Sequence, residues 1–120
     1  MPRNDAVLMR PSHQLADSFA EAVRDYRRAG EQFDRFLAHL LNDLPSYLQF
    51  CENMRAGKRL PRGIVPSSTY WLVRNGDTIV GSGRVRHRLT RALEKEGGHI
   101  GYTIRPSFRR QGYGTLICRL

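Results

Sequence analysis

A short basic segment with two glycines carries the clearest chemical signal of the sequence: residues 109–114 read RRQGYG. The surrounding pattern predicts a strand before this segment and a helix that begins near Gly112. Backbone N–H groups at the start of a helix attract anions, and glycine lets the backbone approach a diphosphate because it has no Cβ. The spacing excludes a P-loop, which needs Gly-Lys-Ser/Thr, and the three-glycine dinucleotide turn. The segment therefore predicts a turn that binds phosphate or pyrophosphate.

The same segment resembles the Arg/Gln-x-x-Gly-x-Gly/Ala motif of the GNAT N-acetyltransferases, with Arg109, Gly112 and Gly114 at the motif positions. The preceding residues 101–107, GYTIRPS, and the upstream order of strand, helices, hairpin and strand are similar as well. More narrowly, residues 86–102 resemble a subgroup of predicted bacterial acetyltransferases. The resemblance covers essentially the whole chain.

The resemblance implies an N-acetyltransferase that uses acetyl-CoA as cosubstrate and no metal, with direct attack of a primary amine on the thioester. In this family the turn's backbone amides hold the CoA pyrophosphate, and the end of the preceding strand pairs with the pantetheine arm. A backbone N–H of that strand would stabilise the developing oxyanion. Carried onto this sequence, the implied CoA-binding residues are Thr103, Ile104, Arg105, Arg109, Arg110, Gln111, Gly112, Tyr113, Gly114 and Thr115.

Direct attack also needs a base, because the ammonium form of an amine, with a pKa of about 10, is no nucleophile. Residues 99–104 contain no carboxylate, although many family members use one near this strand. His99 and His87 are the candidate proton relays, since an imidazole titrates at about pH 6.5. Either one can equally be a hydrogen-bonded structural histidine.

The N-terminal half predicts one strand followed by helices. An apolar run at residues 6–9 predicts the strand, and helical spacing continues between a Ser12 N-cap and a Gly30 stop. A second helix is expected over residues 33–44, whose apolar positions keep helical spacing. A third is expected between an Asp43 cap and Gly57, with Pro45 tolerated in its first turn.

Residues 31–57 thus form an expected helical segment on the acceptor side, and its apolar stripes serve either as core or as a lid over substrate. Residues 69–104 form an expected β-meander. Its first strand, residues 69–74, is apolar on both faces and should be covered on both sides. Asn75-Gly76 then predicts a tight hairpin, because both positions of its turn favour a positive φ.

The second and third strands of the meander are expected at residues 78–89 and 99–104, before the CoA-binding turn and helix start at residues 105–120. Arg84, Arg86 and Arg88 alternate along the second strand and share one face. That face is either solvated or lines a site for an acidic ligand. Gly81 and Gly83 offer places for a bulge that shifts this alternation.

The composition fits one ordinary globular domain of 120 residues, with 40% hydrophobic and 26% charged residues. This content excludes a disordered chain, and apolar runs of about four residues are far below the roughly 20 of a membrane span. Two distant cysteines, Cys51 and Cys118, exclude a disulfide scaffold. Without an export signal at the N-terminus, we expect a cytoplasmic protein with free thiols.

The net charge of +9 keeps a basic nucleic-acid-binding module as an alternative function. Against it, the arginines spread through the chain and no nucleic-acid motif is present, so nucleic acid is an unlikely partner. The many arginines suit phosphate and carboxylate ligands, or reflect genomic base composition. The acceptor is expected to be a small-molecule or peptide amine.

The fold class expected from these features is α/β (α+β), a mostly antiparallel central sheet flanked by helices, forming the N-terminal part of an acyl-CoA N-acyltransferase fold. Residues 1–120 would be a single, incomplete domain, because the sequence ends inside the helix after the turn and family members continue with further strands. An uncovered strand edge would favour association, so a homodimer is possible. The remaining alternative is a non-catalytic fragment or regulatory domain.

Overall fold

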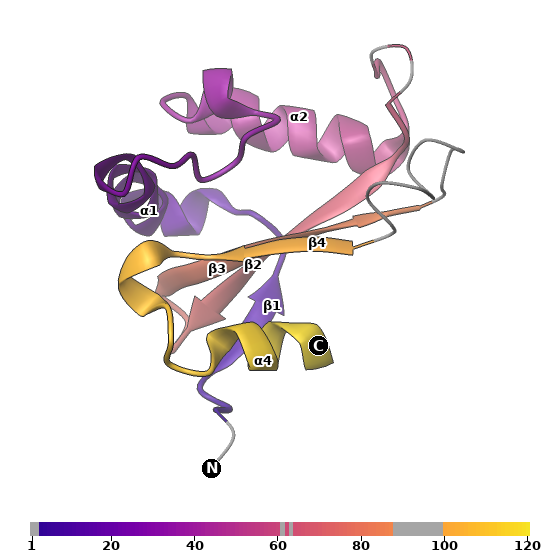
Figure 1. The fold of residues 1–120 in the computed structure, drawn as a ribbon. Coiled ribbons are helices and arrows are strands. Elements are labelled where there is room, and N and C mark those ends of the chain that lie inside the picture. Colours follow the sequence, from indigo (N-terminus) through magenta and orange to yellow (C-terminus); the bar gives the residue numbers. More distant parts are fainter. Residues whose placement is uncertain (1–2, 61, 63, 88–99) are drawn as a thin grey trace.

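An antiparallel sheet with helices on both faces organises the chain, as a computed structural model describes it for residues 3–60, 62, 64–87 and 100–120. In this part of the chain the sheet has four strands in the order β1-β2-β3-β4. They are β1 (Ala6–Met9), β2 (Ser67–Arg74), β3 (Thr78–Arg86) and β4 (Ile100–Ile104). Helices α1 (Ala16–Arg28) and α2 (Leu44–Ala56) lie over one face, and α4 (Tyr113–Arg119) lies under the other (Figure 1). The α+β class expected from the sequence is confirmed.

Strand β2 is buried on both faces, as its continuous apolar sequence predicts. Trp71 and Val73 join the core beneath α1 and α2, where Phe19 stacks on Trp71 at 5.5 Å between ring centroids. Leu72 points the other way, into a smaller core with Leu116 of α4. Two separate apolar layers therefore hold the sheet between its helices.

The predicted helix caps and hairpin turn are confirmed. The Asp43 carboxylate accepts a hydrogen bond from the Ser46 N–H at 3.2 Å, and Gly57 ends α2 with φ +72°. Gly30 follows α1 with φ +74°, and Ser12 caps the short 3-10 helix His13–Leu15 that precedes α1. The hairpin residues Asn75 and Gly76 both have positive φ, as the tight turn requires.

The helix expected over residues 33–44 is wrong as an α-helix. This segment contains bends and turns with one short 3-10 helix, Ala38–Leu40. The Asp34 carboxylate accepts from the Leu37 N–H at 3.1 Å and also binds Tyr47 and Arg84, so contacts to α2 and β3 hold this segment. The apolar positions still serve the core, since Phe33, Leu37 and Leu41 are buried. The spacing of the apolar residues therefore predicted correctly which residues are buried, but it predicted the wrong backbone conformation.

A β-bulge at Val80 sets the faces of strand β3. Leu72 is opposite Gly81 while Val73 is opposite Ile79, so Val80 is the extra residue. Its carbonyl accepts from the Arg105 N–H at 2.8 Å, and the neighbouring Ile79 N–H donates to Ser18 Oγ at 2.7 Å.

The bulge has a consequence for the polar half of β3. Ile79 belongs to the core under α1 and α2, whereas Val80 belongs to the core against α4. Beyond the bulge, Ser82 and Arg84 lie on the face of the sheet that α1 and α2 cover. The bulge that the sequence associated with Gly81 and Gly83 is therefore present one residue earlier, and it brings Arg84 to the same side as Ile79.

Candidate functional site

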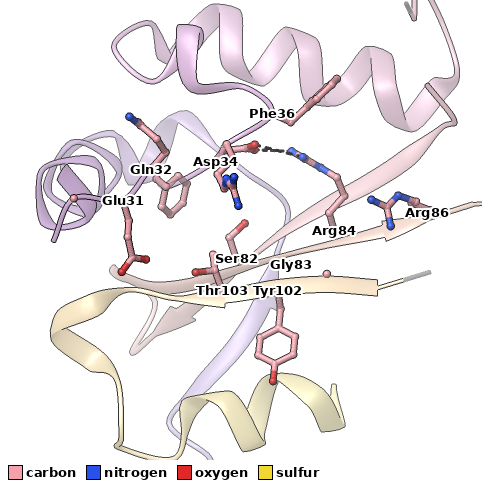
Figure 2. Close-up of a pocket in the computed structure, with 14 residues that line it drawn as sticks. Glu31, Gln32, Asp34, Phe36, Ser82, Gly83, Arg84, Arg86, Tyr102 and Thr103 are labelled. Atoms are coloured by element: carbon pink, nitrogen blue, oxygen red, sulfur yellow. Dashed lines mark hydrogen bonds and ion pairs between the residues drawn. The ribbon is translucent and has the colours of Figure 1, made fainter. Parts of the chain in front are cut away.

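A cavity of about 780 Å³ lies between residues 30–36, the second half of β3 and the start of β4. Figure 2 shows its polar side chains, which enter from the segment after α1 on one side and from the sheet on the other. Gly101, Tyr102 and Thr103 supply the β4 side. Among the described residues β4 pairs with β3 alone, so its second edge has backbone groups available to a ligand.

A buried ion pair between Asp34 and Arg84 forms one wall of this cavity. Arg84 Nη2 and Asp34 Oδ2 lie 2.6 Å apart, with 22% and 7% of the two side chains exposed. Asp34 also accepts from the Tyr47 hydroxyl at 3.0 Å, and Arg84 Nε donates to Thr69 Oγ1 at 3.1 Å. Burial alone would lower the pKa of Arg84, but the adjacent Asp34 carboxylate outweighs burial and raises it. Arg84 is therefore a fixed cation.

The arginine-bearing face of β3 is thus not simply solvated. Arg84 and Arg86 both line the cavity, and Arg84 is paired there with Asp34, so a site for an acidic ligand stays a prediction. Arg88 lies outside the described residues.

The end of β4 is held in place by contacts to α1 and to the following turn. Thr103 Oγ1 and the Tyr26 hydroxyl are 2.9 Å apart, and burial raises the pKa of Tyr26 to about 12. The Ile104 carbonyl accepts from Arg109 Nε at 2.8 Å, while the Ile104 side chain packs towards the α4 core. The Thr103–Ile104 backbone therefore has a defined position at the cavity.

Arg105 is buried, and its side chain holds neighbouring elements together. Its guanidinium donates to Asp25 Oδ2 at 2.7 Å and to the Ile79 carbonyl at 3.3 Å. Asp25 also accepts from the N–H and hydroxyl of Ser107, at 3.2 and 2.8 Å. Sequence reasoning missed Asp25, although an acid beside Tyr26 on the apolar side of an amphipathic helix is a usable signal. The network ties α1 to the 3-10 helix Pro106–Phe108 of the turn.

The turn that follows exposes backbone at the start of α4. Gly112 has φ +92°, and Leu116 N–H to Gly112 carbonyl, at 3.1 Å, is the first hydrogen bond of the helix. The N–H groups of Tyr113, Gly114 and Thr115 therefore precede the first intrahelical donor. A Cβ built on Gly114 would meet no atom within 4 Å, so this surface is open.

The side chains of the turn divide into anchors and exposed groups. The Tyr113 ring is buried, and its hydroxyl binds Arg3 and Asp5 at 2.6 and 3.0 Å. Gln111 Nε2 donates to the Ser107 carbonyl at 3.2 Å. Arg110 is exposed with φ +62°. For Tyr113, only the backbone can reach a ligand at this surface.

Arg109 connects the turn with the cavity through a bidentate ion pair. Its Nη1 and Nη2 lie 2.8 and 2.7 Å from the two carboxylate oxygens of Glu31, a cavity residue. This contact lowers the pKa of Glu31. Glu31 and Asp34 are functional candidates that sequence reasoning missed; their position directly after the Gly30 helix stop was the available signal.

Of the two histidines expected as proton relays, the structure describes His87, and this residue does not line the cavity. His87 is exposed, and its Nε2 lies 2.9 Å from Ser68 Oγ. This position favours the structural interpretation of His87. His99 lies outside the described residues.

The described part of the chain contains neither a cluster of metal-ligating side chains nor a membrane-spanning helix. No three of its histidine, cysteine, aspartate and glutamate side chains gather as a metal site would require. None of its helices is long and apolar enough to cross a membrane. Cys51 is buried and Cys118 exposed, both as free thiols.

Comparison with known proteins assigns the family. Residues 33–120 match the sequence model of the Acetyltransferase (GNAT) family. The matched region begins at the cavity segment and includes the hairpin, β4 and the turn before α4. No curated protein and no solved structure matches the chain. Because the match spans well over half of the sequence, the chain belongs to the GNAT acetyltransferase family.

Proposed function

We propose that this protein transfers the acetyl group of acetyl-CoA to a primary amine by direct attack of the amine on the thioester. The observation that carries the proposal is an open cavity at the β4 edge, next to a helix start with exposed amides, in a chain of the acetyltransferase family. These features supply a binding surface for each of two substrates, and the surfaces meet at Thr103 and Ile104.

The CoA diphosphate would bind at the start of α4. The N–H groups of residues 113–115 point out of the first helical turn and have no partner inside it. The open surface over Gly114 allows close approach of an anion, and Arg110 adds an exposed positive charge nearby. Gly112, Gln111 and Arg109 complete this turn by their backbones.

The thioester end would lie along β4. Its second edge accepts no strand from the described residues, so the backbone of Thr103 and Ile104 can pair with the pantetheine arm. A backbone N–H at this edge would stabilise the negative charge that develops on the carbonyl oxygen. The amine would approach from the cavity side, between β3 and residues 30–36.

Removal of the amine proton needs a group at the cavity. Asp34 already accepts four hydrogen bonds, from Leu37, Tyr47 and Arg84, so its oxygens are occupied. Glu31, the second carboxylate of the described lining, is paired with Arg109 at both oxygens, but that pair is exposed and water can reach it. A relay through water to Glu31, or through His99 as the sequence predicts, would remove the proton.

The assay is acetyl-CoA-dependent release of thiol in the presence of a panel of amines. The matched variant is Gly114→Glu, which places a carboxylate on the open surface where the CoA diphosphate would bind, in the first turn of a helix that tolerates an acidic residue there. We expect thiol release by the wild-type chain, and weaker acetyl-CoA binding by a variant that melts at the same or a higher temperature. A folded wild-type chain that binds no acetyl-CoA and releases no thiol with any amine would contradict the proposal.

A further inference from the structure

Charges of both signs line the cavity, which contains Glu31, Asp34, Arg35, Arg84 and Arg86, with Arg84 paired to Asp34. Glu31 lies at the end near Thr103, and Arg84 and Arg86 lie further along β3 (Figure 2). Arg109, the partner of Glu31, also binds the Ile104 carbonyl, and Ile104 is opposite Gly81 in the sheet. Arg84 and Arg86 are three and five residues beyond Gly81, about 10 and 16 Å along the strand.

Glu31 is placed to receive a cation in the cavity. Its N–H donates to the Tyr26 carbonyl at 2.8 Å, and the buried Phe33 follows two residues later, so its backbone is fixed to the end of α1. Its carboxylate is 42% exposed and its partner Arg109 39% exposed. An exposed ion pair of this kind is screened by water and exchanges readily. An incoming ammonium group can therefore bind the Glu31 carboxylate together with Arg109 or in its place.

Arg84 and Arg86 also line a second, smaller cavity of about 160 Å³. Ser67 belongs to this second cavity and is opposite Arg86 in the sheet. The residue is 1% exposed, and its hydroxyl has no hydrogen-bond partner among the described residues. A buried hydroxyl without a partner is unfavourable, so it marks a place where a ligand oxygen would be stabilised.

We propose that the acceptor amine also carries an acidic group, so that its ammonium binds at Glu31 and its acid binds between Arg84, Arg86 and Ser67. This inference rests on the proposed acetyl transfer, since it places the amine at the β4 end of the cavity. The separation along β3 excludes an acceptor whose two groups are adjacent. It fits an ω-amino acid or a short peptide with a free N-terminus and an acidic group further along.

The pattern of charge also excludes other amines. A diamine or polyamine would bring a second cation to two arginines, and a simple alkylamine would leave the Ser67 hydroxyl without a partner. Both cost affinity relative to the acid-bearing amine.

The test is calorimetric binding of aminohexanoate, aminooctanoate, hexylamine and hexanediamine to the chain, with and without CoA. We expect the amino acids to bind about tenfold more tightly than hexylamine, as a hydrogen-bonded charge predicts, and hexanediamine to bind most weakly. Equal or tighter binding of hexylamine would overturn the inference. Binding needs no turnover, so a chain without acetyltransferase activity that still prefers aminohexanoate refutes only the proposed function.

Two substitutions test the acid-binding end and the ammonium-binding end of the cavity separately. Ser67→Ala removes the unpartnered hydroxyl with little change of volume, so it should fold, and it should weaken binding of the amino acids but not of hexylamine. Glu31→Gln should weaken binding of every amine. Ser68→Ala is the matched control, because Ser68 contacts His87 outside both cavities. If Ser67→Ala and Ser68→Ala bind aminohexanoate alike, the acid does not bind at Ser67 and the inference is wrong.

Discussion

Asp25 of α1 accepts a hydrogen bond from the Arg105 guanidinium at 2.7 Å, and this buried pair joins the first helix to the turn after β4. Only 5% and 10% of the two side chains are exposed. The residues are eighty positions apart in sequence. The pair therefore fixes the position of the proposed CoA-binding turn relative to the helical layer.

Asp25→Asn should destabilise the protein by about 3 kcal/mol, because it leaves a buried guanidinium without its counter-charge. Denaturant unfolding measures this loss. Glu21→Gln, on the exposed side of the same helix, is the control and should change stability by less than about 0.5 kcal/mol. Equal stability of the two variants would mean that the pair contributes nothing to the fold.

Stability should also fall at acidic pH. Burial would raise the pKa of Asp25, but the hydrogen bonds from Ser107 and Arg105 outweigh burial and lower it. A carboxyl whose pKa is lower in the folded state stabilises the fold above its unfolded value, about pH 4, and loses that contribution as the pH falls through the folded value. The free energy of unfolding, measured from pH 7 to pH 2, should decline less steeply in Asp25→Asn than in the wild type.

Gly81→Ala should displace β4 from β3. A Cβ at this position would lie 2.8 Å from the Thr103 carbonyl oxygen and 2.9 Å from Ile104 Cδ1, so the strands must separate. We expect a loss of about 1–3 kcal/mol of stability, as for other overpacked sites. Gly101→Ala on the partner strand is the control, since its Cβ meets nothing within 4 Å. The account of this strand pair would be wrong if Gly101→Ala were the more damaging change.

The two thiols should react at very different rates. Burial raises the pKa of Cys51 to about 11, whereas Cys118 is exposed. A thiol reagent at neutral pH should therefore modify one cysteine rapidly in the native protein and both after denaturation. Rapid modification of Cys51 in the folded chain would show that α2 does not pack its buried face against the core.

Local signals in the sequence predicted the local features well. The Asp43 cap, the Gly57 stop and the Asn75-Gly76 turn each depend on a residue's own conformational preference, and each is confirmed. The two-sided burial of β2 followed from its apolar run. The motif at residues 109–114 identified the family because its spacing is specific to that turn.

Features that depend on distant partners were not predictable in this way. Asp34 lies inside the helical pattern of residues 33–44, yet its carboxylate binds Arg84 of β3 and Tyr47 of α2, which no periodicity can show. The position of the bulge at Val80 depends on Ser18 and Arg105, which satisfy its backbone groups. The cavity carboxylates were missed for the same reason, since it is the folded chain that brings residues 30–36 to β4.

The most direct measurement is a thermal-melt titration of the chain with acetyl-CoA, with ATP as a competing phosphate ligand and at low and high salt. The account predicts a saturating stabilisation of about 2.7 kcal/mol at a hundred times the dissociation constant. This stabilisation should exceed that from ATP and be lost in Gly114→Glu, whose carboxylate would repel the diphosphate. A cooperatively melting chain with no response to acetyl-CoA, or with equal responses to both ligands, would contradict a CoA site at the start of α4.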